Sequence, residues 1–255
     1  MTRTLFMGAS LLAAATAHAN ERHFTYTYDT LVLPRGIREV EVWTTLRPRD
    51  EGLLIDNRVE LELPVTDRLL TSLYLNSTSS PDGVQTSVSN EWKLQLVNPT
   101  VKPVGLALYG EVGLAPSETE LEAKILLDHH SEKFLVAYNL VGEVEFEREF
   151  EAGEGEVEEE YVVENDLGIA FLPVHNLSVG LEIRNHNEFP EGEFEHAVFF
   201  AGPTLGFTSE DFWVAATALP QIGAFMDDGD GETQWGRELE EHESFNGRVL
   251  VGVNF

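Results

Sequence analysis

The chain has 255 residues, no cysteine and a formal net charge of −29 at pH 7. The lack of cysteine excludes disulfides, a thiol nucleophile and cysteine-ligated metals, and the negative charge excludes nucleic acid as a partner on electrostatic grounds. After the first apolar stretch, the sequence never approaches the roughly 20 continuous apolar residues that a membrane-spanning helix needs.

The first residues predict export. Arg3 precedes an apolar stretch from Leu5 to Ala15, and Ala17-His-Ala19 supplies the small residues of a leader-peptidase site. We therefore expect residues 1–19 to be a signal peptide that is cleaved near Ala19. The rest of the chain, about 235 residues, suits one all-β barrel or sandwich better than two domains.

Residues 20–36 precede the first predicted barrel strand. Phe24, Tyr26 and Tyr28 alternate in this segment, and a Pro-Arg-Gly sequence ends it at Gly36. Three interpretations stay open: a periplasmic extension, a strand added at the seam of a barrel, and a plug inserted into the barrel.

Residues 37–255 alternate apolar and polar side chains with the period of two that is typical of strands. The alternation predicts an all-β fold, a transmembrane antiparallel up-and-down β-barrel of about 12 strands. An even number of strands fits a barrel with both termini on the periplasmic side. The predicted strands are 38–47, 54–63, 68–77, 86–97, 104–114, 119–127, 134–146, 159–171, 177–186, 197–207, 212–221 and 244–255.

The connections between these strands are predicted to alternate in length. Those after even-numbered strands are short and turn-like, as in 64–67 and 209–211. Most of those after odd-numbered strands are longer and acidic, and the longest run over 147–158, 187–195 and 223–243. Short periplasmic turns opposite long outer loops are typical of outer-membrane barrels.

One phase of the strands is apolar over a length that fits a membrane. From Phe134 to Phe146 this phase covers roughly 40 Å of strand, which becomes about 30 Å along the membrane normal at a tilt of about 40°. Tyr161 and Phe171 bracket the apolar phase of the next strand in the same way. We therefore predict that this phase faces lipid and that the opposite phase faces the lumen.

The predicted lumen phase is acidic, with acids outnumbering bases by about two to one. Charge on the lipid face would cost up to about 2–4 kcal/mol per Lys or Arg, so its confinement to one phase supports this orientation. The residues predicted to line the lumen and to set its selectivity are Glu39, Glu41, Glu60, Glu62, Glu111, Glu120, Glu122, Glu143, Glu145, Glu160, Arg58, Lys124, Arg184 and Arg248.

An acidic wall concentrates cations and repels anions. The sequence therefore favours a passive channel or porin for cations or for small cationic or neutral solutes. The charge is equally compatible with surface solvation and an interior closed by Arg–Glu pairs. The barrel would then have a structural or interaction role, and its outer loops would bind divalent cations, lipopolysaccharide or a partner.

The last strand alternates up to the carboxyl terminus. Its apolar face consists of Phe245, Val249, Val251, Val253 and Phe255. Such a strand resembles the sorting signal of bacterial outer-membrane barrels, which implies recognition by the barrel-assembly machinery and contact with outer-membrane lipid. We expect it to pair with the first strand, around residues 40–46. The alternative is the final strand of a soluble β-sandwich.

Two stretches near the N-terminus carry a family resemblance. Thr25-Tyr-Thr-Tyr28 with Leu33-Pro-Arg-Gly36, leading into Glu39-Val-Glu-Val-Trp43, resembles the opening of a family of uncharacterised proteobacterial outer-membrane β-barrel proteins. The likeness is strongest over residues 24–47 and in the last strand. It implies a porin-like barrel in the bacterial outer membrane, and it transfers no catalytic or binding residue.

Catalytic patterns are thin, and we expect no enzyme. His186 and His196 flank one predicted outer loop, and His242 precedes Ser244 in another, which is the closest approach to the His and Ser of a lipid-acting barrel enzyme. His129-His130 lies in a predicted periplasmic turn and could hold an adventitious metal.

One acidic loop resembles the start of a calcium loop, with oxygen-bearing side chains at alternate positions: Asp228, Asp230 and Glu232. The pattern then fails, since the sixth position is Thr233 and the twelfth is Leu239. We expect no cofactor beyond weak Ca²⁺ or Mg²⁺ binding at such loops.

Overall fold

A computed structural model describes residues 22–151, 154–227 and 233–255. The predicted signal peptide, its cleavage site near Ala19, and the loop acids Asp228, Asp230 and Glu232 lie outside the described residues. Within these ranges, no helix is both long and apolar enough to cross a membrane.

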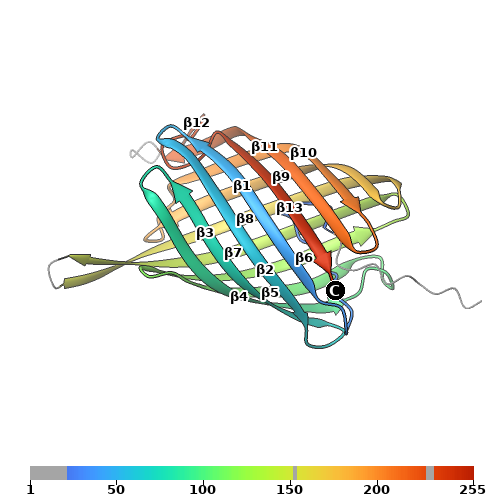
Figure 1. Ribbon diagram of the computed structural model, residues 1–255. Coiled ribbons are helices and arrows are strands. Elements are labelled where there is room, and N and C mark those ends of the chain that lie inside the picture. Colours follow the sequence, from blue (N-terminus) through green and yellow to red (C-terminus); the bar gives the residue numbers. More distant parts are fainter. Residues whose placement is uncertain (1–21, 152–153, 228–232) are drawn as a thin grey trace, which may run out of the picture.

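Thirteen antiparallel strands form one sheet, and twelve of them close into a barrel (Figure 1). Each barrel strand pairs with the next along the chain. The strands are β1 (Glu39–Arg49), β2 (Gly52–Pro64), β3 (Leu69–Ser80), β4 (Gly83–Val97), β5 (Gly105–Leu114), β6 (Glu118–His130), β7 (Phe134–Glu151), β8 (Glu154–Val174), β9 (Leu177–Pro190), β10 (His196–Thr208), β11 (Phe212–Asp227) and β13 (Phe245–Asn254). The extra strand, β12 (Thr233–Gly236), pairs with the end of β11. The predicted all-β up-and-down barrel is confirmed.

The last strand closes the barrel on the first. Val253 pairs with Val40, and Val251 pairs with Val42. On its other edge, β13 pairs with β11, so no long strand is left with an open edge. Closure of this kind gives each long strand a partner on both edges, which a strand inside a membrane requires.

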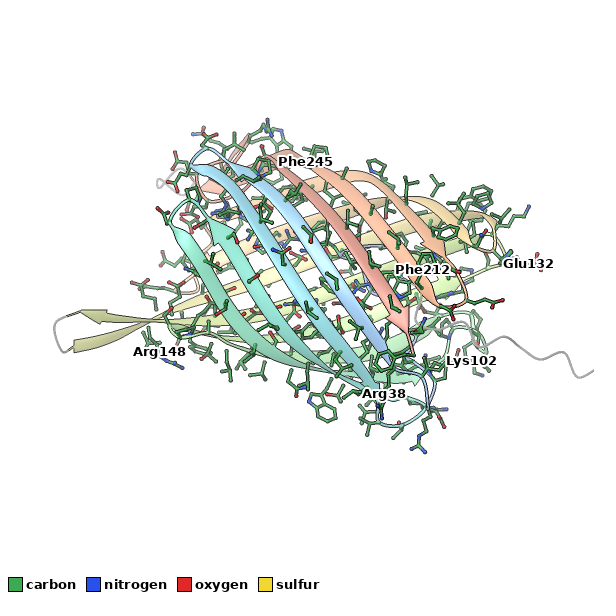
Figure 2. The ribbon with its side chains drawn as sticks, viewed as in Figure 1. Arg38, Lys102, Glu132, Arg148, Phe212 and Phe245 are labelled. Atoms are coloured by element: carbon green, nitrogen blue, oxygen red, sulfur yellow. The ribbon has the colours of Figure 1, made fainter. Side chains whose placement is uncertain are left out.

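The two faces of each long strand differ as the alternation predicts. In β7, Phe134 and Leu140 are 51% and 39% exposed, while Leu135 and Val141 are 2% and 3% exposed. The exposed phase carries apolar side chains around the barrel, and Figure 2 shows the labelled charges Arg38 and Lys102 at one end of it. The exterior is therefore the lipid-facing surface of a transmembrane barrel.

The predicted longer connections are found only after β9 and β11. The connections after β1, β3 and β5 are turns of two or three residues, 50–51, 81–82 and 115–117. They are as short as the turns at the opposite end. The predicted loop 147–158 is instead a ladder that extends β7 and β8, with Glu147 opposite Glu158, and it projects beyond the barrel (Figure 1).

The prediction was wrong here because it ended strands where apolar alternation ended. Strands continue as long as their backbones stay paired, whether or not apolar and polar side chains still alternate there. Arg47-Pro-Arg49 at the end of β1 is such an extension, since it stays paired with residues 52–54 of β2.

Candidate functional site

The N-terminal segment, residues 22–36, lies mainly inside the barrel. Phe24, Tyr26, Tyr28 and Leu33 are all buried. Tyr28 packs with side chains of β1, β5, β6, β11 and β13, and Phe24 packs with side chains of β7 and β8. Of the three interpretations that the sequence leaves open, the described part of this segment matches an insert in the lumen.

The backbone of the segment is held by side chains of the barrel wall and not by backbone pairing with a strand. Glu182 of β9 accepts hydrogen bonds from the backbone N–H groups of Tyr26 at 2.7 Å and Thr27 at 2.6 Å. The side chain of Asn139 accepts one from the Tyr28 N–H and donates one to its carbonyl. These contacts satisfy the buried backbone groups of an extended segment that pairs with no strand.

A cavity of about 460 Å³ lies between this segment and the outer end of the barrel. Its floor is formed by Tyr26 and Tyr28 of the segment together with Trp43 of β1. Its walls carry nine carboxylates, six Lys or Arg side chains and two histidines. We call this cavity the vestibule.

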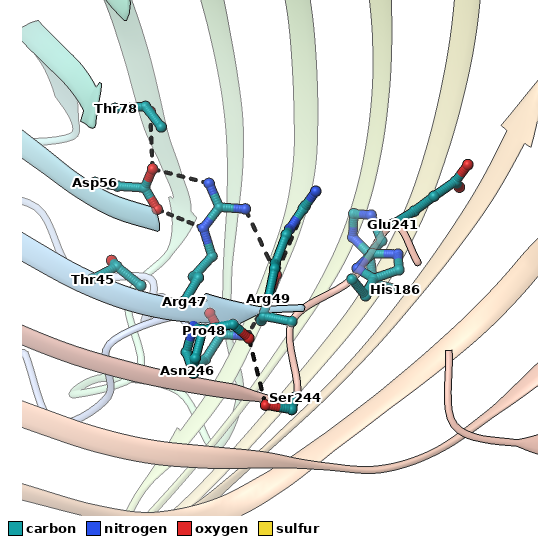
Figure 3. Close-up of polar contacts among 12 residues, drawn as sticks. Thr45, Arg47, Pro48, Arg49, Asp56, Thr78, His186, Glu241, Ser244 and Asn246 are labelled. Carbon is teal, nitrogen blue, oxygen red and sulfur yellow. Dashed lines mark hydrogen bonds and ion pairs between the residues drawn. The ribbon is translucent and has the colours of Figure 1, made fainter. Parts of the chain in front are cut away.

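The basic residues of the vestibule are paired or stacked. Arg47 donates to Asp56 at 2.6 and 2.9 Å, as Figure 3 shows, and Arg49 lies beside it. Arg58 faces Glu111 at 3.4 Å and lies 4.3 Å from the Tyr74 ring centroid. Cation–π stacking of this kind keeps a guanidinium in place without neutralising it.

Further along the wall, two more arginines are held in the same manner. Arg184 donates to Glu164 at 2.7 Å. The guanidinium of Arg248 lies 3.6 Å from the centroid of the Tyr26 ring, and it donates to the Thr25 carbonyl at 3.3 Å. Arg248 thus ties the last strand to the N-terminal segment.

The acidic residues on β6 and β7 have fewer cationic partners. Glu118, Glu120 and Glu145 bring carboxylate oxygens within 4.8 Å of one another. Among the ion pairs of the described residues, none involves these three side chains, whereas Glu122 pairs with Lys124 at 3.1 Å. Because β6 and β7 stand across the barrel from β1 and β13, the acidic and arginine-rich walls face each other.

The predicted lumen residues therefore occupy different environments. Those that line the vestibule are Arg58, Glu111, Glu120, Glu122, Lys124, Glu143, Arg184 and Arg248. Glu39, Glu41, Glu60 and Glu62 are buried and lie outside the vestibule lining. Glu39 accepts a hydrogen bond from the Trp213 indole, and Glu41 accepts one from the Trp43 indole. Glu145 and Glu160 are partly exposed and also lie outside that lining.

The loop 237–244 folds over the mouth of the vestibule. The carboxylate of Glu238 accepts N–H groups of Glu240, Glu241 and His242 at 2.8–3.3 Å, and this cap presents the His242 side chain inward. Burial lowers the pKa of His242, and His186 and His196 add to this effect. Burial opposes ionisation of Glu243, but Arg47 and Arg184 hold the pKa of this carboxyl below its usual value.

The histidines considered for catalysis do come together, but without the serine. His186, His196 and His242 meet around Glu188. Ser244 instead directs its hydroxyl at the Pro48 carbonyl, 3.4 Å away (Figure 3). No Ser–His hydrogen bond forms within the part of the chain that the structure describes, so the nucleophile and base of a lipid hydrolase are not assembled here.

The other histidine pair lies at the opposite end of the barrel. His130 contacts Asp128 at 3.1 Å, while His129 contacts the Pro103 carbonyl. Asp128 also accepts the backbone N–H of Thr30 at 2.7 Å. The two rings thus face different partners, and Asp128 serves to hold the N-terminal segment.

The residues predicted as the assembly signal lie on the outer face of β13 and at the terminus. Val249, Val253 and Phe255 are exposed, and Phe245 and Val251 are partly exposed. Their recognition by the assembly machinery stays a prediction.

Solved structures show the same fold at low sequence identity. The COG4313 outer-membrane channel from Pseudomonas putida F1 has a TM-score of 0.59 and 13% identity, over 89% of this chain and 98% of that one. The NanC porin has a TM-score of 0.55 and 8% identity, over 85% of this chain and 98% of that one. The KdgM porin, solved in complex with disordered oligogalacturonate, has a TM-score of 0.53 and 7% identity, over 85% and 99%. Identities this low establish the fold alone.

Comparison with curated protein sequences gives no match. A family model does match, over residues 16–255, and its description is "Family of unknown function (DUF6662)". Because this match covers nearly the whole chain, the protein is a member of the DUF6662 family.

Proposed function

We propose that the protein is a channel of the bacterial outer membrane that passes cations or small cationic or neutral solutes through its vestibule. In this proposal the signal peptide is removed near Ala19, and the C-terminal strand directs assembly into the membrane. The fold that the chain shares with porins and channels supports a transport role, and the lipid-facing exterior supports the location.

The observation that carries the proposal is the unequal pairing of charges in the vestibule. Its nine carboxylates exceed its six basic side chains, and the bases are already paired with acids or stacked on rings. Glu120 and Glu143 on the opposite wall face the cavity without an ion pair among the described residues. Clustered carboxylates with few counter-charges attract cations, so a positive solute supplies the missing partner.

The N-terminal segment sets a condition on transport. The vestibule ends at Tyr26 and Tyr28, and the next void beneath, beside Phe24 and Asp29, has a volume of about 10 Å³. A solute larger than water therefore passes only when this segment shifts. We propose that the segment is the gate of the channel.

Conductance of the full mature chain in planar bilayers tests the proposal. We expect intermittent openings, with reversal potentials of cation-selective sign under a KCl gradient. Replacing both Glu120 and Glu143 with Gln should move the reversal potential toward zero. The matched control is Glu147→Gln on the projecting hairpin, which should leave it unchanged. A lack of conductance, or anion selectivity of the wild-type protein, would refute the proposal.

A closed interaction barrel is the second candidate, and the filled interior beneath the vestibule favours it. In that case, the acidic outer hairpin would bind divalent cations, or lipopolysaccharide bridged by them. This candidate predicts no conductance from the wild-type protein or from variants that release the N-terminal segment. It also predicts that Glu147→Gln weakens association with lipopolysaccharide in the presence of Mg²⁺.

A further inference from the structure

Three histidines and one glutamate converge at the mouth of the vestibule. The Nε2 atoms of His186, His242 and His196 lie 2.7, 3.0 and 3.1 Å from carboxylate oxygens of Glu188. The Nε2 atoms of His196 and His242 lie 2.7 Å from each other. All four side chains are largely buried, with exposures of 3–14%.

Different parts of the fold bring these four side chains together. His186 and Glu188 are two residues apart on β9, so they share its inward face. His196 begins β10 and stands directly opposite Glu188 in the ladder. His242 comes from the loop 237–244, which the Glu238 cap holds in place. Strand register and a capped loop fix the cluster, which is the rigidity that a binding site needs.

One N–H···N hydrogen bond can join His196 and His242, but each of these Nε2 atoms also lies 3.0–3.1 Å from a carboxylate oxygen of Glu188. Two N–H groups cannot point at each other across 2.7 Å, so at least one of these nitrogens presents a lone pair. That lone pair lies beside the Glu188 carboxylate, which also presents only lone pairs when ionised. A cation among these atoms resolves the conflict.

The two ring nitrogens of His186 lead to the same conclusion, because each of them contacts a carboxylate. Its Nδ1 lies 2.7 Å from Glu164, and its Nε2 lies 2.7 Å from Glu188. A neutral imidazole has one N–H, so one of the two contacts sets a lone pair against a carboxylate. Arg184 lies 3.2 Å from His186 Nδ1, but it also donates to Glu164. With the proton on Nδ1, Glu164 takes the orienting position that carboxylates occupy behind metal-bound histidines, and the Nε2 lone pair is free to bind a metal.

We propose that His186, His196, His242 and Glu188 form a binding site for a divalent transition-metal ion of the Zn²⁺ class. Imidazole nitrogens favour Zn²⁺, Cu²⁺ and Ni²⁺, whereas Ca²⁺ and Mg²⁺ favour sites made of oxygen alone. Ligands at 2.0–2.1 Å from tetrahedral Zn²⁺ lie about 3.3 Å apart. The separations of 2.7–3.1 Å between His196 and His242 and between each histidine and Glu188 reach that spacing when these groups move apart by a few tenths of an ångström.

The site does not depend on the proposed transport function. A bound ion would join the loop 237–244 to β9 and β10 across the mouth, whether or not the barrel conducts. The ion would also neutralise part of the acid at the rim, next to Glu241, which lies 3.8 Å from His196 Nδ1.

Metal titration of the full mature protein, folded in detergent without an affinity tag, tests the site. We expect one equivalent of Zn²⁺ to bind, in competition with a chromophoric chelator, and a tenfold excess of Ca²⁺ or Mg²⁺ not to displace it. Substitution with Co²⁺ should give the visible spectrum of a four-coordinate site with nitrogen and oxygen ligands. Glu164→Gln, which removes the orienting carboxylate, should weaken binding about 10- to 100-fold.

His242→Ala and Glu188→Gln should remove most of the tight binding. The matched controls are His175→Gln and His129→Gln, which change histidines at the opposite end of the barrel and should bind as the wild type does. Heat-modifiable gel mobility checks that each variant is folded. No tight equivalent in the wild type, or loss of binding in the control variants in place of His242→Ala, would overturn the proposal.

Discussion

Replacing Glu182 with alanine should release the N-terminal segment from the barrel. The carboxylate of Glu182 is buried and accepts the backbone N–H groups of Tyr26 and Thr27 at 2.7 and 2.6 Å. It also accepts the Thr217 hydroxyl at 2.9 Å. The alanine variant leaves these two N–H groups, and the more distant Thr25 N–H at 3.2 Å, without their acceptor inside the barrel.

An unsatisfied buried N–H costs about 1–3 kcal/mol, so the two together cost about 2–6 kcal/mol. Water can enter the space left by the carboxylate, which favours the lower half of this range. About 3 kcal/mol corresponds to a shift of roughly 100-fold in the ratio of displaced to inserted segment, since about 1.4 kcal/mol is a factor of ten.

Two assays report on this shift. Trypsin should cleave after Arg22, which is 8% exposed in the inserted segment, much faster in Glu182→Ala than in the wild type. Channel openings in planar bilayers should become longer. The control is Glu120→Ala, which removes an inward carboxylate of the vestibule that does not contact the segment. Equal protease sensitivity of Glu182→Ala and the wild type would refute the reasoning that this carboxylate holds the segment in place.

Three further changes test the packing and the orientation. Gly168→Ala should also loosen the segment, because the added Cβ would lie 2.7 Å from the Phe24 ring. The control is Gly110→Ala, whose added Cβ meets nothing nearer than 3.8 Å. We expect trypsin to cleave the Gly168→Ala protein faster than this control. Leu140→Arg places a charge on the lipid face at a cost of about 2–4 kcal/mol. The yield of folded barrel from this variant should fall well below the yield from Glu143→Arg, which places the charge in the vestibule. Equal yields would show that the two faces are assigned wrongly. Gly202→Ala should impair assembly, since its Cβ would overlap the Ala218 carbonyl oxygen of the neighbouring strand, whereas normal refolding kinetics would show that β10 and β11 can separate at this point.

The barrel was predictable from the sequence because its two faces meet different solvents. Alternation of the kind seen from Phe134 to Val141 fixes which side chains face lipid, and the terminal strand had to pair with the first strand for the barrel to close. Both features depend on local periodicity and on backbone pairing, which sequence shows directly. The position of Pro48 and Arg49 in a strand was missed, because the predicted first strand ends at Arg47 and β1 continues to Arg49.

The site was predictable only in part, because it depends on contacts between distant residues. Glu182 and Tyr26 are 156 residues apart in the sequence, and no local sequence pattern near either residue predicts their contact. The metal cluster had a usable signal in His186-Asn-Glu188, since a histidine and a carboxylate two residues apart on a strand share a face. The sequence also singled out His242, but together with Ser244, because its position beside Glu188 depends on the Glu238 cap of a loop.

The acidity of the barrel interior therefore has two separate physical causes. A segment that runs through a lumen without a ladder exposes backbone N–H groups, and an ionised carboxylate meets several of them at once because it only accepts hydrogen bonds. Glu182 and Asp128 act in this way toward the N-terminal segment, so their role is to hold this segment in place. In the channel that we propose, selectivity depends on the smaller set of carboxylates on β6 and β7 that face the vestibule. A count of inward acids from the sequence overstates the field that a solute would meet, and only the vestibule acids should change the reversal potential when they are neutralised.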